Sequence, residues 1–120
     1  MTERSRSPRF KSLIIPSSDP EQTAAWYSIA GITFDEEQHG KGPIHQSAEL
    51  EAKKTLIEFY PEDTAIRIGF EVDSVEEVSN KYIEEGILPR HLAKESKYGK
   101  FITFKDPNGI IVEFREPPQS

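Results

Sequence analysis

The chain has 120 residues and a formal net charge of -6, with 30% charged and 35% hydrophobic residues. This length predicts one domain with a single core. The negative charge argues against nucleic acid and anionic membranes as partners, because no basic face is available to neutralise phosphates. No apolar run approaches the roughly 18 residues of a membrane span, and the basic, serine-rich N-terminal residues lack the apolar segment of a secretory signal. The sequence has no cysteine, which excludes disulfides and thiolate chemistry, and we expect a cytoplasmic protein.

The first half of the chain begins with an expected disordered lead over residues 1–9, followed by a predicted strand over residues 11–15 that ends at Pro16. Either Ser18 or Asp19 is suited to cap a helix, with Pro20 at a first-turn position. We expect this helix to reach Ala30, to bury Trp26 and Ile29, and to end at a glycine. Strands are then predicted at residues 32–36, 44–50 and 55–60, with a glycine-rich loop over residues 39–43.

The second half repeats this order. A strand over residues 66–72 precedes a helix that Ser74 and Glu77 open with capping-box spacing. Its apolar positions recur at helical intervals, namely Val75, Val78, Tyr82 and Ile83. An edge strand is predicted over residues 87–92, then a charged loop over residues 94–100. A hairpin over residues 101–114 closes the chain, because Asp106-Pro107-Asn108-Gly109 is a suitable turn between two apolar strands.

Repetition at half the chain length indicates an internal duplication. The predicted fold class is therefore α+β, with two βαβββ units over residues 10–61 and 65–116. Together they form one domain over residues 10–116, and residues 117–120 are left as a tail.

Alternation along the strands gives each of the four best strands one apolar face, which the amphipathic helices are expected to cover. The opposite faces carry Ser12, Glu58, Arg67 and Glu113. If those faces look inward, two carboxylates and a guanidinium line a cleft with apolar walls, the usual form of a small-molecule site. If they look outward, the same residues are merely solvated. Alternation alone leaves both arrangements open.

The paired βαβββ order, the sequence DPNG followed by IIVEF, and the Asp-Pro-capped helix followed by Trp26-Tyr27 resemble the vicinal oxygen chelate superfamily. This group includes glyoxalase I, extradiol dioxygenases, fosfomycin-resistance transferases and bleomycin-binding proteins. The resemblance covers residues 10–116. It implies a mixed sheet curled around a cleft, with the helices on the outer face, and in metal-binding members one ligand from each of four strands.

Carried over position by position, the resemblance places Glu58 and Glu113 on ligand positions. Ser12 falls where the family has His or Gln, and Arg67 falls where it has His. The implied metal site is therefore degenerate or rearranged. His45 on the third strand could complete a rearranged site with the two glutamates, holding Zn, Ni, Mn or Fe. The alternative is a cleft without metal, in which Arg67 forms ion pairs with both glutamates.

Two classes of function stay open. The first is a metal-dependent lyase or isomerase of the glyoxalase type, in which Glu58 and Glu113 are the catalytic carboxylates. The second is a metal-free, ligand-sequestering protein of the bleomycin-resistance kind, in which Arg67, Ser12, His45 and Tyr60 contact the ligand. The partners expected in either case are a small molecule and a second copy of the chain in a homodimer. His39 and His91 are expected to be surface residues without a role.

Overall fold

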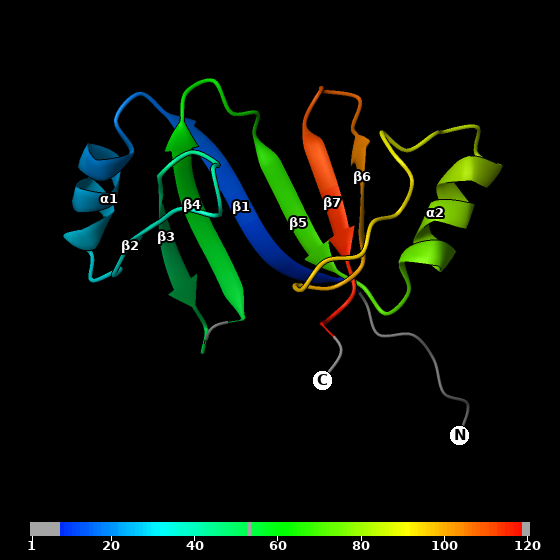
Figure 1. Ribbon diagram of the computed structural model, residues 1–120, viewed down its shortest axis with the longest axis horizontal. Coiled ribbons are helices and arrows are strands. Elements are labelled where there is room, and N and C mark those ends of the chain that lie inside the picture. Colours follow the sequence, from blue (N-terminus) through cyan, green and yellow to red (C-terminus); the bar gives the residue numbers. More distant parts are fainter. Residues whose placement is uncertain (1–7, 53, 119–120) are drawn as a thin grey trace. The chain divides into compact units, whose positions relative to one another are not determined.

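The computed structural model describes residues 8–52 and 54–118, so most of the predicted lead and the end of the tail lie outside the described residues. The helices and strands (Figure 1) are β1 (Arg9–Ser17), α1 (Pro20–Ser28), β2 (Asp35–Glu37), β3 (His45–Leu50), β4 (Thr55–Pro61), β5 (Arg67–Glu71), α2 (Val75–Glu84), β6 (Phe101–Lys105) and β7 (Ile111–Arg115). The α+β class is confirmed. Among the described residues, no helix is long and apolar enough to cross a membrane. Lys11–Arg67 forms one compact unit, called the first unit below, and the described residues outside this range form the second unit.

The sheet of the first unit has the strand order β2-β3-β4-β1. Strands β2, β3 and β4 pair antiparallel, and β4 pairs parallel with β1. Helix α1 packs on β3 and β4, where Phe59 is 1% exposed and stacks on Tyr27 and Phe34 at ring-centroid distances of 5.1 and 5.4 Å. Because neighbouring residues of a strand point to opposite faces, Glu58 lies on the face that α1 leaves uncovered.

The second unit contains the strands β5-β7-β6 in that order. Its hairpin is held at the predicted turn, where Asp106 Oδ1 accepts hydrogen bonds from the backbone N–H groups of Asn108 and Ile110. Ser74 caps α2 by accepting a hydrogen bond from the N–H of Glu77, as predicted. The core lies between α2 and the hairpin and contains Val72, Val75, Ile102, Phe104 and Phe114.

Three expectations about the elements are wrong. Residues 87–92 form no strand, and the position beside β6 is taken by an isolated bridge between Lys94 and Phe101. Trp26 and Ile29 are 69% and 85% exposed, because α1 is short and turns Ala24 toward the sheet instead. Strand β1 starts at Arg9, inside the expected lead, and continues through Pro16, which pairs with Tyr60.

Candidate metal centre

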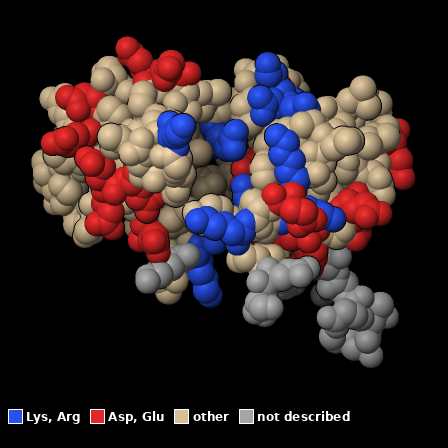
Figure 2. Space-filling model, in the orientation of Figure 1, with Lys and Arg blue, Asp and Glu red and all other residues tan. Residues whose placement is uncertain are grey.

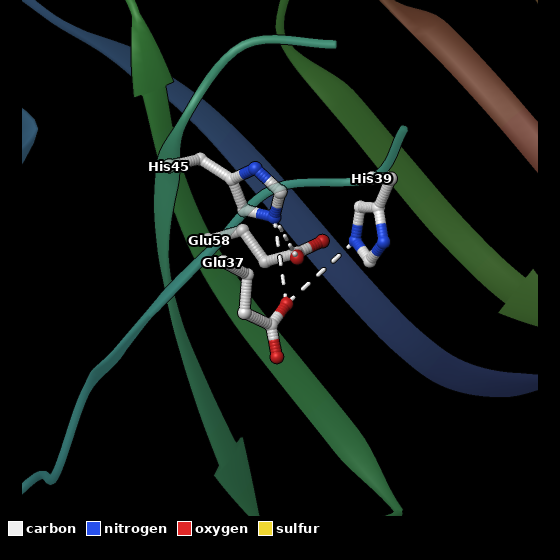
Figure 3. A group of neighbouring side chains, drawn as sticks. All are labelled: Glu37, His39, His45 and Glu58. Atoms are coloured by element: carbon white, nitrogen blue, oxygen red, sulfur yellow. Dashed lines mark ion pairs between the residues drawn. The ribbon is translucent and has the colours of Figure 1, made fainter. Parts of the chain in front are cut away.

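Four side chains that can bind a metal meet on the uncovered face of the first unit: Glu37, His39, His45 and Glu58. Glu37 ends β2, His45 begins β3, Glu58 lies in the middle of β4, and His39 lies in the loop between β2 and β3. Each offers one donor atom, and the four atoms lie within 4.8 Å of one another. Figure 3 shows the two imidazole rings and the two carboxylates facing a common point.

The strand register explains why these residues meet. Glu37 lies opposite His45 in the β2–β3 pair, and Ser47 lies opposite Glu58 in the β3–β4 pair. His45 and Ser47 are two residues apart and therefore point to the same face. The pairing thus brings together residues that are up to 21 positions apart in the sequence.

His45 presents a buried ring nitrogen, Nε2, to the carboxylates of Glu37 and Glu58. The residue is 1% exposed, and its Nδ1 lies 3.1 Å from the carbonyl oxygen of Pro43. A carbonyl oxygen only accepts hydrogen bonds, so Nδ1 carries the proton and Nε2 presents a lone pair in the neutral ring. This Nε2 is buried and has no hydrogen-bond partner, although it lies 3.4 Å from Glu37 Oε1 and 3.3 Å from Glu58 Oε2.

With the neutral ring of His45, three electron-rich atoms face each other: its Nε2, Glu37 Oε1 and Glu58 Oε2. A proton shared between His45 and a carboxylate would draw the two groups to about 2.7–2.9 Å, and the observed separations are longer. They match the spacing of about 3.3–3.4 Å between tetrahedral ligands that each lie about 2.0–2.1 Å from a zinc ion. The side chains present therefore fit a divalent metal.

The carboxylate of Glu58 is fixed in place by burial and by a hydrogen bond, as is usual for a metal ligand. Its residue is 7% exposed, and Ser47 hydrogen-bonds to its carboxylate. Burial raises the pKa of Glu58, and the charge of Glu37 raises it further, while His45 acts in the opposite direction. A cation between the carboxylates would act in the opposite direction to burial, because it favours the charged form of Glu58.

Tyr60 fixes the plane of the His45 ring. The two rings stack with centroids 4.0 Å apart and planes 9° apart. Burial, followed by the charge of Glu58, raises the pKa of Tyr60 to about 12, so the phenol stays neutral and adds no charge to the site. The stacking restrains the His45 ring together with the hydrogen bond from Nδ1 to the Pro43 carbonyl, which is the contact that usually orients a metal-binding histidine.

The surroundings of the cluster are negative. Figure 2 shows acidic side chains gathered over the region of β2 and β3, where Asp35, Glu36 and Glu49 are exposed. Together with the net charge of -6, this field attracts cations to the first unit.

Of the residues singled out in the sequence, His45, Glu58 and Tyr60 are brought together. Ser12 lies on β1 opposite Leu56 and outside the cluster. Arg67 begins β5, and its charge lowers the pKa of Tyr60. The pairing of Arg67 with the two glutamates stays a prediction.

Glu113 belongs to β7 of the second unit, where Arg115 Nε donates a hydrogen bond to its Oε2 at 2.8 Å. Arg115 is a partner of this carboxylate that was not expected from the sequence. Arg115 supplies it with positive charge from two positions along the same strand.

Two members of the cluster were missed. Glu37 was not singled out at all, and His39 was expected to lie on the surface without a role. The only signal for them is the spacing of Glu37, His39 and His45 around a turn. That spacing becomes meaningful only once the β2–β3 register is known, since a strand shifted by one residue would point Glu37 away.

The register also shows how the two units correspond. Glu113 pairs with Thr103 as Glu58 pairs with Ser47. The bridge between Lys94 and Phe101 corresponds to the pair of Glu37 and His45. The four cluster positions thus correspond to Lys94, Ser96, Phe101 and Glu113, and Tyr60 corresponds to Arg115. Of these four positions in the second unit, one carries a His, Asp or Glu side chain, and that residue is Glu113.

Comparison with known proteins supports the fold. A scan against family models gave no match, and neither did a search of the curated proteins. Among solved structures, methylmalonyl-CoA epimerase from Mycobacterium tuberculosis matches with a TM-score of 0.70 at 16% identity, over 92% of this chain and 89% of that one. A hypothetical protein from Bacillus halodurans matches with a TM-score of 0.73 at 15% identity, over 96% and 98%. A catechol 2,3-dioxygenase matches with a TM-score of 0.67 at 18% identity, over 92% of this chain and 42% of the longer enzyme.

The epimerase and the dioxygenase belong to the vicinal oxygen chelate superfamily. The fold predicted from the paired βαβββ order and the DPNG hairpin is therefore confirmed. At these identities the likeness concerns the fold, and the chemistry has to be argued from the site.

Proposed function

We propose that this chain, which has the vicinal oxygen chelate fold, is a divalent-metal-dependent enzyme of the glyoxalase type, acting as a lyase or isomerase on a small oxygen-bearing molecule. The observation that carries the proposal is the buried Nε2 of His45, which has no hydrogen-bond partner and faces the carboxylates of Glu37 and Glu58. Glu37, His39, His45 and Glu58 would hold the ion. Two imidazoles with two carboxylates suit Zn, Fe, Ni or Mn.

When bound, such an ion polarises a substrate oxygen and makes a neighbouring C–H bond more acidic. The protein's own groups would divide the remaining work. Glu58 is buried and hydrogen-bonded by Ser47, so it serves as a fixed negative charge. Glu37 has a 36% exposed side chain, and only its Oε1 faces the two histidines. Its other carboxylate oxygen is therefore the atom best placed to take a proton from a substrate and return it.

The walls of the site are suited to a small molecule. Ile14 lies beside Glu58 in the β1–β4 pair, on the same face of the sheet, and Tyr60 lies beside His45. An apolar side chain and an aromatic ring next to a few polar groups are typical of small-molecule sites. The methylmalonyl-CoA epimerase among the structural neighbours acts, by its name, on a carbonyl compound, which favours a substrate with an acidic C–H bond.

The proposal is tested by the metal content of the purified protein. After loading with Zn²⁺, Ni²⁺, Mn²⁺ or Fe²⁺ and dialysis, we expect one of these ions to remain at about one equivalent per chain. Glu37→Gln and His45→Ala should each abolish retention. Glu36→Gln is the matched control, because Glu36 is exposed and adjacent to Glu37 but points to the other face of β2.

Absence of bound metal under every loading condition would contradict the proposal. Stabilisation of the metal-free protein by an organic ligand would then favour the ligand-sequestering alternative. A thermal-shift panel with metals and with small carbonyl compounds separates the two functions in one experiment.

A further inference from the structure

We propose that His39 is a displaceable ligand of the metal. It would bind the ion in the absence of substrate and move away from the ion when a substrate binds. This inference rests on the proposed function and adds a division of labour within the site. Glu37, His45 and Glu58 form the permanent part of the centre, and His39 occupies the position at which a substrate oxygen binds.

The first reason is the support behind each side chain. Glu37, His45 and Glu58 lie on paired strands, so the ladder hydrogen bonds fix their backbones. His39 lies in the loop between β2 and β3. Catalytic zinc sites commonly have three protein ligands and a fourth position for water or substrate. Three strand-held ligands and one loop-held ligand reproduce this division.

The second reason is exposure and distance. The side chain of His39 is 53% exposed, compared with 1% for His45 and 10% for Glu58. Its Nε2 lies 3.7 Å from Glu37 Oε1, which is longer than the separations of 3.3 and 3.4 Å around His45. The two imidazole rings are 5.0 Å apart and tilted by 35°, so they are not stacked. Moving His39 outward therefore disrupts little buried packing.

The third reason is the turn that carries His39. The backbone N–H of Gly42 donates to the carbonyl of His39 at 2.9 Å, and Gln38 Nε2 donates to the carbonyl of Gly42 at 2.9 Å. Both hydrogen bonds join residues of the turn to each other, so the turn can move as one piece without losing them. Gly40 has a φ of +59°, a left-handed conformation that glycine adopts without strain.

Access of a substrate oxygen to the proposed ion would therefore depend on the position of His39. With His39 bound, one position of the proposed ion would be taken by the protein. A substrate oxygen would take that position when the imidazole moves outward. The same position can be filled again after product release, because the turn retains its internal hydrogen bonds.

Cobalt spectroscopy tests the inference. We compare wild type with His39→Ala, His45→Ala and the control Lys41→Ala, whose exposed side chain belongs to the same turn. We titrate each protein with Co²⁺ and record the visible absorption spectrum and the affinity. For His39→Ala we expect about one equivalent of Co²⁺, an affinity reduced by about 10- to 100-fold, as for a supporting group, and an altered spectrum. Free imidazole should restore the wild-type spectrum.

The control should match wild type, and His45→Ala should bind no Co²⁺ and gain nothing from imidazole, because its position is buried. If His39→Ala loses the metal as completely as His45→Ala, His39 is a permanent ligand and the inference is wrong. An unchanged spectrum in His39→Ala would also overturn it, since His39 would then not be a ligand. If wild type itself binds no Co²⁺, the proposed function fails instead.

Discussion

Replacing Glu58 with glutamine should change stability in different ways with and without metal. In the metal-free protein, burial raises the pKa of Glu58 above its ordinary value of 4.5. The native state therefore binds more protons than the unfolded state between 4.5 and the raised value, so the contribution of Glu58 to stability falls as the pH rises through this window. Glutamine has nearly the same shape, carries no charge, and can still accept the hydrogen bond from Ser47. We expect metal-free Glu58→Gln to be at least as stable as wild type at pH 7.

The metal-loaded proteins should differ in the other direction. A ligand present at about 100 times its dissociation constant stabilises the native state by about 2.7 kcal/mol. For a domain of this size, about 1 kcal/mol corresponds to a shift in Tm of about 4 °C. Wild type should therefore gain about 10 °C in Tm on saturation. Glu58→Gln loses a charged ligand from a site with four, and we expect nearly all of this gain to disappear.

Both effects can be read by thermal unfolding at pH 5 and pH 8, with EDTA and with added Zn²⁺. Glu36→Gln is the control, because it removes the same charge from an exposed position of the first unit, and it should keep the full metal-dependent gain. An equal gain in Glu58→Gln would refute the role of Glu58 as a ligand. A metal-free Glu58→Gln that is less stable than wild type at pH 8 but not at pH 5 would refute the argument from burial.

Three further outcomes follow from the structure. Glu113→Gln should leave metal retention, measured by elemental analysis, within about two-fold of wild type. The carboxylate of Glu113 accepts a hydrogen bond from Arg115, and Glu113 is not among the four residues of the cluster, so the substitution removes no metal-binding atom from it. Phe59→Ala should cost about 3–5 kcal/mol in urea unfolding, whereas Trp26→Ala, at a 69% exposed position, should change stability by less than about 0.5 kcal/mol. Gly99→Ala should destabilise more than Gly109→Ala in the same assay, because an added Cβ at Gly99 would lie 2.0 Å from the carbonyl oxygen of Glu116 and at Gly109 would meet nothing within 4 Å.

Local signals in the sequence predicted the parts of the fold that depend on local chemistry. The Asp106–Gly109 turn, the cap of α2 at Ser74 and the assignment of Phe59 and Glu58 to opposite faces all agree with the structure. Each depends on residues within a few positions of one another. The same alternation placed His45 and Glu58 among the candidates for one site.

Expectations that depended on distant neighbours were less accurate. Residues 87–92 were expected to form a strand, and at an edge because the segment contains Pro89. The structure gives them no strand partner, and Arg90 uses its backbone N–H for a hydrogen bond to the carbonyl of Thr103. Trp26 was expected in the core because it lies on the predicted apolar stripe of the first helix, yet Ala24 takes that place on α1. In both cases the choice depends on what packs alongside, which a single sequence does not reveal.

The cluster of Glu37, His39, His45 and Glu58 shows the same limit at the candidate site. Ligands on different strands are related by register, and register depends on the lengths of the turns between them. The family resemblance pointed to one ligand from each of four strands, which directed attention to Glu113. The structure instead brings together residues of β2, β3, β4 and the β2–β3 loop, an arrangement that four-strand reasoning does not consider.

The two units compensate a buried carboxylate at corresponding positions in different ways. Glu58 and Glu113 are both 7% exposed, and a buried carboxylate requires a compensating charge or proton. In the second unit, Arg115 supplies that charge at 2.8 Å and lies over the ring of Phe101 at 4.4 Å. In the first unit, the corresponding pair is Tyr60 stacked on His45. The phenol of Tyr60 is neutral and Glu37 adds a second negative charge, so Glu58 is compensated either by a proton on His45, which lowers the pKa of Glu58, or by a bound cation. The proposed metal ion would do for Glu58 in the first unit what the Arg115 guanidinium does for Glu113 in the second.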